Sequence, residues 1–518
     1  MTNPGAAIKL LITYAICVPA AIFVGFLLTN PLDYGTLGFL GLVLALIFSP
    51  IFIKWHYPIM VFGIGAPMYM FFLKGNPPMM QVVVILSLGI AIVERAMSSD
   101  RRFISVPSMT WPLMFTVLMA YITAELTGGI GLHTLGGAVG GGKKYLALFI
   151  GVAMFFALTS RPIPKEQRRL YLGLFFLSLL PSFISDAFPF LPEPLNYINL
   201  LIPPSSMATT GFSFGETRMG AFANSAGAVV FFMLAKFGLR GIFLGNRLWR
   251  IPVFLLMLVL TLFGGFRGLL ITYAFIITAL FFIEGLHRTR LMLLFVIGMA
   301  MGGALLVPFS NKLPHTFQRA MSFLPLNWDT DVKMDAEGSI TWRENIWRAA
   351  WPQVPNYLLL GKGYALREDD FAMMGVQGID GGQFAGGIAS QIDATQEGLA
   401  ISSDYHNGPL STLMPFGIWG GISILWLMAA GLRLLHLNHK YGDPELATVN
   451  AFLLVLFIFH IFNFFFIFGA YTGDVSDIAK YAGFSVALNW GVRGPARPAS
   501  EPVTFKPPAQ LQRQPQLA

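Results

Sequence analysis

Residues 251–284 read IPVFLLMLVLTLFGGFRGLLITYAFIITALFFIE, an apolar run that contains one arginine, Arg267. A single helix of that length would be about 50 Å long, whereas the hydrocarbon core of a bilayer is about 30 Å thick. A hairpin that turns at Gly264 and Gly265 fits the bilayer better. The run therefore predicts two short membrane helices, with Arg267 beside their turn at the mouth of a cavity. The alternative interpretation is an interfacial arginine that extends to lipid headgroups.

The composition extends the membrane interpretation to the whole chain. Of its 518 residues 55% are hydrophobic and 12% charged, and the mean hydropathy is +0.65. Soluble domains carry about twice that charged fraction, so the sequence predicts an all-α polytopic membrane protein. The net charge of +8 does not indicate a nucleic-acid partner, because the basic residues fall mainly in short connections between apolar runs. Cys17 is the single cysteine, which excludes an intrachain disulfide, and we expect no cleavable leader.

Apolar runs of about 15 to 24 residues predict the membrane helices. They lie at 9–29, 36–53, 57–74, 79–97, 109–126, 145–160, 170–188, 221–237, 251–265, 268–284, 291–308, 409–431 and 447–470, and a weaker run covers 476–491. We therefore expect 12–14 helices in this order: transmembrane helices 1–11 within 1–308, a long loop at 309–408, and the C-terminal helices within 409–491. The segment 492–518, rich in Pro and Gln, predicts a disordered tail.

The charge distribution predicts the orientation. Sixteen Lys and Arg residues fall in the short connections on one side and five on the other, and the richer side is expected in the cytoplasm. The richer set is Lys54, Arg95, Arg101, Arg102, Arg161, Lys165, Arg168, Arg169, Lys236, Arg240, Arg247, Arg250, Arg288, Arg290, Arg433 and Lys440, and the poorer set is Lys74, Lys143, Lys144, Arg218 and Arg267. The long loop is then periplasmic, on the same face as Arg267.

The long loop contains a predicted helix with a candidate functional arginine, Arg343. Thr341 and Glu344 stand in the N-cap to N3 relation of a capping box, and Pro352 is expected to end the helix. Arg348 follows Glu344 at i,i+4 and predicts a surface ion pair, so Arg343 has no obvious local partner. The alternative is an amphipathic helix that lies on the membrane with its tryptophans as anchors.

His406 lies three residues before Pro409, where the next predicted helix begins. A histidine at this boundary titrates near neutrality and is able to take a proton from a sugar hydroxyl. The alternative is a structural histidine that makes hydrogen bonds. His460 lies in the middle of the 447–470 run near Asn463, and we expect it to make an interhelical hydrogen bond.

Two further groups of residues are candidate ligand sites. A glycine-rich connection at 128–144 ends in Lys143 and Lys144 and offers backbone N–H groups and two cations to an anion, although a flexible loop with interfacial lysines explains it equally well. From 310 to 408 the chain holds seven Lys and Arg against twelve Asp and Glu, so phosphate binding there requires specific arginines. The acidic run 368–370 and Asp404 favour a solvated loop face, and no metal site is predicted, because no histidine or second carboxylate stands at ligand spacing.

The order of these motifs resembles that of the O-antigen ligase and polymerase superfamily, bacterial inner-membrane glycosyltransferases. The similar elements are the Gly-Phe-Arg-Gly turn at 265–268, the Arg-x-x-x-Trp pattern that begins at Arg343, the Leu-Gly-Lys-Gly segment at 360–363, and His406 with Asn407 before the next helix. Together they cover about residues 251–430. Phe266 is a departure, because many members of the superfamily have a small polar residue before the arginine.

The resemblance implies a GT-C-like helical fold in the bacterial inner membrane, with the catalytic face periplasmic. It also implies an inverting, metal-independent transfer, without a cofactor, from an undecaprenyl-diphosphate-linked glycan donor to a hydroxyl of a lipid or glycan acceptor. Arg267 and Arg343 would bind the diphosphate and His406 would activate the acceptor. Lys143 and Lys144 are further candidates for substrate binding, and membrane lipids are expected partners.

Two alternatives stay open at this point. A lipid-linked oligosaccharide flippase or other secondary transporter would need charged residues inside the bundle and an internal repeat, and the sequence shows neither clearly. Within the enzymes, a polymerase that joins repeat units and a ligase that transfers the finished chain use the same donor. The residues do not separate these two, because they differ in the acceptor.

The orientation is testable by cysteine labelling in a Cys17→Ala background. Arg343→Cys, Arg267→Cys and His406→Cys should each react with an impermeant thiol reagent added outside the cell, because the outer face is exposed to it, whereas Lys165→Cys should not. Labelling at 165 without labelling at 343 in intact cells would invert the topology.

Overall fold

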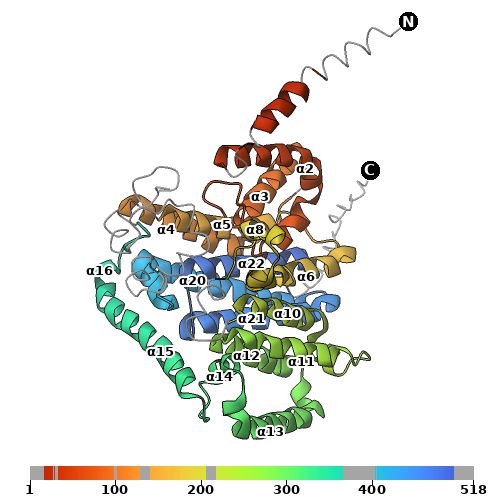
Figure 1. Ribbon diagram of the computed structural model, residues 1–518, viewed down its shortest axis with the longest axis vertical. Helices are drawn as coiled ribbons and strands as arrows, with labels where there is room; N and C mark the ends of the chain where they lie inside the picture. The colour runs from red at the N-terminus through yellow and green to blue at the C-terminus, as the bar shows by residue number, and fades with distance from the viewer. Residues whose placement is uncertain are drawn as a thin grey trace, which may run out of the picture.

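The computed structural model describes residues 17–26, 33–98, 102–128, 141–205, 218–365 and 405–494, together with Tyr14, Thr29 and Ser403. Over these residues the secondary structure is helical, apart from one isolated bridge between Tyr69 and Pro78. The long helices run side by side across the view in Figure 1, and α15 (Thr330–Ala350) follows one edge of the bundle. The acidic run 368–370, Asp404 and the predicted tail from 495 onward lie outside the described residues.

Eight helices of the described part are long and apolar enough to cross a membrane. They are Leu46–Gly63 within α2 (Tyr34–Gly63), α3 (Met79–Met97), α4 (Pro107–Thr127), the broken segment Lys165–Phe190, α10 (Gly220–Phe243), Leu291–Lys312 with α13 (Leu291–Phe309), α20 (Gly408–Tyr441), and Pro444–Phe466 with α21 (Ala447–Phe466). Shorter apolar helices cover Cys17–Phe26, Arg250–Gly264 and Arg267–Ile283. The predicted class, an all-α polytopic membrane protein, is confirmed.

The prediction of two separate helices at 36–53 and 57–74 is wrong. The structure has one helix there, α2, which includes Pro50 and Pro58 and is followed by an irregular segment from 64 to 78. The prediction placed a connection around His56, but this side chain is buried, with Nδ1 2.8 Å from Ser87 Oγ and Nε2 2.6 Å from an Arg161 nitrogen. A polar side chain with partners inside the bundle does not have to interrupt a helix.

The weak run at 476–491 corresponds to α22 (Tyr471–Asn489), which lies inside the bundle. It packs against α5 (Gly142–Leu158), α20 and α21. In Figure 1 the helices α20, α21 and α22 are blue, and α5 beside them is orange. Its polar side chains find partners there: Asn489 exchanges hydrogen bonds with Asn450, and Ser485 accepts one from Asn438. The sequence signal was weak because surrounding helices, and not lipid, cover α22.

The helical hairpin predicted from residues 251–284 is confirmed. α11 (Arg250–Leu260) continues into a 3₁₀ turn (η7, Thr261–Gly264), and α12 (Arg267–Ile283) returns. Gly265 joins them with φ +65°, a left-handed conformation that costs a glycine little and other residues more. Arg267 is thereby fixed at the first position of α12.

Two helices of the long loop cover the hairpin turn. α14 (His315–Met321) packs against α12, and α15 packs against α14. The predicted capping box of Thr341 and Glu344 is wrong, because α15 begins at Thr330 and both residues lie inside it. The preceding residues 330–340 extend the helix, which the local motif did not take into account. The helix does end before Pro352, at Ala350, as predicted.

Candidate functional site

A cavity of about 710 Å³ lies between the hairpin turn, α14, α15 and the end of α21. We call it the arginine cavity. Most of its wall is apolar, and its polar side chains include Arg267, Arg319, Arg343, Glu344, Asn224, Thr272 and Asn463. Residues from the membrane helices and from the long loop, distant in sequence, therefore meet at one site.

The arginines also connect the elements that surround the cavity. Arg267 of α12 donates a hydrogen bond to the carbonyl of Ala336 in α15, with an N–O distance of 3.2 Å. Arg319 of α14 donates to the carbonyl of Gly265 in the hairpin turn at 3.4 Å. Neither carbonyl carries a formal charge, so neither of these two hydrogen bonds neutralises a guanidinium group.

Arg343 is the half-buried member of this group. Burial lowers the pKa of its guanidinium, and the positive charge of Arg319 lowers this pKa further. Its Nε atom is buried and has no hydrogen-bond partner within the described residues. An arginine stays protonated in proteins, so this side chain is a charged donor held in a poorly solvated place. An anion in the cavity would relieve both the repulsion and the missing hydrogen bond.

The local pattern of α15 directs Arg343 inward and Arg348 outward. Ile346 and Ala350 are buried on the inner face, whereas Arg348 is exposed and pairs with Glu344 at 3.4 Å, as predicted. Glu344 is the one acidic residue among the described residues that line the cavity. The lining thus contains three Arg and one Glu whose charge is already shared with Arg348, and its net charge is positive.

α15 also contacts the segment that carries His406. The indole Nε1 of Trp347 donates a hydrogen bond to the carbonyl of Tyr405 at 2.8 Å, and the Tyr405 side chain is buried. On the other side of His406, the Asn407 side chain caps α20 by accepting the N–H of Leu410 at 3.1 Å. Both neighbours of His406 are therefore fixed to rigid elements.

His406 itself has a φ of +50°, which is uncommon for a residue with a side chain. Such a backbone conformation persists where the surrounding packing holds it, and it occurs often at functional sites. The imidazole lies 4.8 Å from the ring of Phe468, centroid to centroid, and Phe468 lines the arginine cavity. The structure thus places His406 beside the cavity wall.

The structure brings together three of the five residues selected from the sequence. Arg267 and Arg343 line one cavity, with His406 next to it. Lys143 and Lys144 at the start of α5 do not line this cavity, and the Lys144 ammonium lies 5.4 Å from the ring centre of Tyr364. Their predicted contact with substrate stays a prediction. Most of the glycine-rich connection before them, residues 129–140, lies outside the described residues.

Arg319 is the residue that the sequence analysis did not select. It is one of four arginines in the loop from 310 to 408, and nothing in its own segment distinguishes it. Its partner, the Gly265 carbonyl, lies 54 positions away in the sequence. The sequence gives one indication of its role: the loop is net acidic, so phosphate binding there would need specific arginines, and each arginine of the loop is a candidate.

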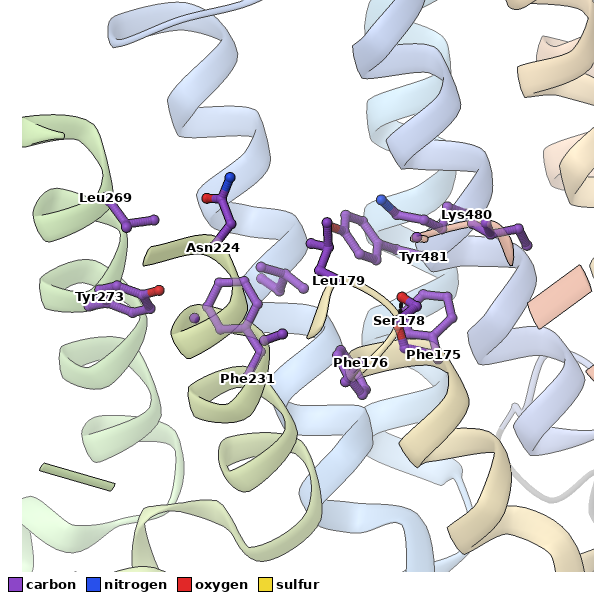
Figure 2. A pocket seen from close by; sticks show the side chains of 15 residues that line it. Phe175, Phe176, Ser178, Leu179, Asn224, Phe231, Leu269, Tyr273, Lys480 and Tyr481 are labelled. Carbon is purple, nitrogen blue, oxygen red and sulfur yellow. Dashed lines mark hydrogen bonds between the residues drawn. The ribbon is translucent and has the colours of Figure 1, made fainter. Parts of the chain in front are cut away.

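A smaller cavity of about 140 Å³ shares Asn224 and Leu269 with the arginine cavity. Figure 2 shows Tyr273 and Asn224 on one side of it and Lys480 and Tyr481 on the other. It is too small for a glycan and is lined mainly by aromatic and aliphatic side chains. Among the described residues, no three His, Cys, Asp or Glu side chains gather as metal ligands would.

Fold and site together define a polytopic helical membrane protein with a cationic cavity where its membrane helices meet a helical loop. Residues 252–425 match the family model described as O-antigen ligase. The match covers about a third of the 518 residues and contains Arg267, Arg319, Arg343 and His406. The match confirms the predicted resemblance of this segment to the O-antigen ligase and polymerase superfamily. No curated protein matches the chain.

The Trp347 contact leads to a stability prediction. Trp347→Phe removes the N–H donor to the Tyr405 carbonyl, which should lower the free energy of unfolding by about 0.5–1.5 kcal/mol. Thermal unfolding of the purified protein in detergent measures the change. Trp351→Phe is the matched control, because Trp351 is exposed and follows the same helix. Equal effects of the two substitutions would contradict an anchoring role for Trp347.

Proposed function

We propose that the protein is a membrane glycosyltransferase that moves a glycan from an undecaprenyl-diphosphate carrier to an acceptor hydroxyl. Activity of the O-antigen ligase or polymerase type follows from the domain at 252–425. The single observation that carries the finer assignment is the convergence of Arg267, Arg319 and Arg343 on one cavity. Guanidinium groups bind phosphate oxygens in bidentate geometry, and a diphosphate offers enough oxygens for several of them.

The arginines also suit the chemistry of the leaving group. Transfer breaks the bond between the anomeric carbon and the diphosphate oxygen, so negative charge grows on the departing undecaprenyl diphosphate. Fixed cations in a poorly solvated cavity stabilise such a charge strongly. Because three arginines supply this stabilisation, the proposed reaction needs no metal ion.

His406 is proposed as the general base. Its imidazole accepts the proton of the acceptor hydroxyl while the acceptor oxygen attacks the anomeric carbon, on the face opposite the leaving diphosphate. The configuration at that carbon is therefore inverted. The position of His406 beside the cavity wall, and not among the arginines, supports separate sites for acceptor and diphosphate. In this proposal the site faces the periplasm, within a GT-C-like bundle of the inner membrane.

One observation from the structure bears on the transporter alternative, which requires charged residues inside the bundle. The sequence showed no charged residues inside the bundle clearly, and this was wrong, because Asp474, Asp477 and Lys480 of α22 lie there near His460. They form two pairs, His460 with Asp474 and Lys480 with Asp477. A transporter needs charged groups that are free to exchange partners with a substrate, and paired groups fit that role less well.

A reaction in detergent distinguishes the two classes. The purified protein, mixed with an undecaprenyl-diphosphate-linked glycan and an acceptor, should form product without any membrane compartment. A flippase would form none. A deletion strain then separates ligase from polymerase: finished chains accumulate on the carrier if a ligase is missing, and single repeat units accumulate if a polymerase is missing.

The arginine assignment leads to the next prediction. Arg267→Ala, Arg319→Ala and Arg343→Ala should each abolish transfer, and the corresponding Lys variants should restore it only in part, because lysine keeps the charge without the bidentate geometry. Radiolabelled donor and purified enzyme measure the rate. Arg348→Ala is the matched control on α15 and should retain activity, since Arg348 is exposed. Full activity of Arg343→Ala would reduce α15 to a structural element.

The base assignment predicts that His406→Ala lowers the transfer rate by roughly two to four orders of magnitude, the usual contribution of a positioned acid–base group. Donor binding should survive, because the arginines remain. The rate of the unmodified enzyme should fall in acid, since only the neutral imidazole accepts a proton. His315→Ala in the same loop, outside the cavity lining, is the control and should stay active. Near-normal transfer by His406→Gln would overturn the base role.

A further inference from the structure

The turn between α21 and α22, residues 467–470, connects the arginine cavity with His406. Ile467 and Phe468 of this turn line the cavity together with Asn463 and Phe466 from the end of α21. The ring of Phe468 also packs on the imidazole of His406, at 4.8 Å between centroids and 37° between planes. The position of this one ring therefore limits where the imidazole is able to lie.

Asn463 fixes the first half of the turn. Its carbonyl accepts the N–H of Ile467 at 3.0 Å and that of Phe468 at 2.9 Å. Its side-chain amide donates to the carbonyl of Phe468 at 2.6 Å. Both backbone polar groups of Phe468 are thus bound to a single residue of α21.

A buried pair of side chains fixes the second half. Asp474, in the first turn of α22, accepts the N–H of Ala470 through Oδ2 at 2.7 Å. Its other oxygen, Oδ1, lies 2.9 Å from Nε2 of His460 on α21. The His460 and Asp474 side chains are 12% and 5% exposed, so the contact is shielded from water. One carboxylate therefore reaches α21, the turn and α22, through a hydrogen bond to the turn and a close N–O contact with His460.

Close packing then connects the turn to the segment of His406. A Cβ atom at Gly469 would lie 2.6 Å from the Cα of Gly408, and one at Gly408 would lie 2.3 Å from the Phe464 carbonyl oxygen. Real contacts of that kind do not occur, so both positions need glycine for this approach. Gly408 stands two residues after His406, and any displacement of the turn would be transmitted to it.

We propose that His460 and Asp474 are positioning residues for His406: their buried contact holds the 467–470 turn so that Phe468 keeps the imidazole at the edge of the arginine cavity. This inference rests on the proposed role of His406 as the base. A base has to lie within hydrogen-bond reach of the acceptor proton, and a displacement of about 1 Å is able to cost a factor of 10² in rate. Asp477 and Lys480, further along α22, pair with each other and leave Asp474 to His460.

The test is a double-mutant cycle with purified full-length protein, an undecaprenyl-diphosphate-linked glycan and a saturating acceptor. Phe468→Leu and Asp474→Asn should each lower kcat between about tenfold and 10²-fold and leave the KM for the donor unchanged, because the arginines are untouched. In a His406→Ala background the same substitutions should have no further effect, since no base remains to be positioned. Asparagine at 474 still accepts the Ala470 N–H but lacks the charge opposite His460.

Matched controls separate positioning from a general loss of folding. Phe465→Leu changes an exposed ring beside the same turn and should leave kcat unchanged. Asp443→Asn breaks another ion pair, with Arg168 at 2.8 Å, and should also leave it unchanged. If Asp474→Asn does not fold, His460→Gln, which changes the other member of the pair, takes its place and should show the same dependence on His406.

Each outcome has one meaning. Equal losses from Phe468→Leu in the native and His406→Ala backgrounds would overturn the positioning role while the base assignment stands. Full activity of His406→Ala would overturn the proposed base, whatever the turn variants do. A loss confined to the native background supports both assignments.

Discussion

The repulsion among three guanidinium groups around one cavity is the constraint on which the site depends. Arg267, Arg319 and Arg343 belong to three different helices, and each helix is fixed by contacts that keep the charges together. The hydrogen bonds from Arg267 to the Ala336 carbonyl and from Arg319 to the Gly265 carbonyl offset part of the repulsion and also join α12, α14 and α15. In the proposed function the arginines bind an anionic group, and the apolar wall suits one that is attached to a lipid.

The rest of the bundle follows from a second constraint: polar groups between membrane helices need partners inside the protein. α22 shows this most clearly. Its Asn489 pairs with Asn450, its Asp474 with His460, and its Asp477 with Lys480. These pairs are expensive to bury and give the central helices one fixed register. The same register places the 467–470 turn against the segment of His406.

The sequence predicts what depends on length and local pattern and misses what depends on distant partners. The hairpin at 251–284 was predictable because two glycines divide a run too long for one helix. The predicted helix break near His56 was wrong. The partners of the His56 ring, Ser87 and Arg161, are far away in the sequence, so a local pattern does not reveal them. Arg319 was missed for the same reason. Thr341 resembled an N-cap because the motif was considered without the eleven preceding residues of α15, Thr330 to Ile340.

Gly265 has a consequence for how this protein is able to diversify. The residue makes the hairpin turn with its left-handed backbone and gives its carbonyl to Arg319. A substitution there would disturb both the membrane hairpin and the hydrogen bond of a cavity guanidinium group. The outer face of α15, which carries the exposed Arg348, does not combine two such structural roles. Substitutions on that outer face of α15 should therefore be tolerated more readily than substitutions at the turn.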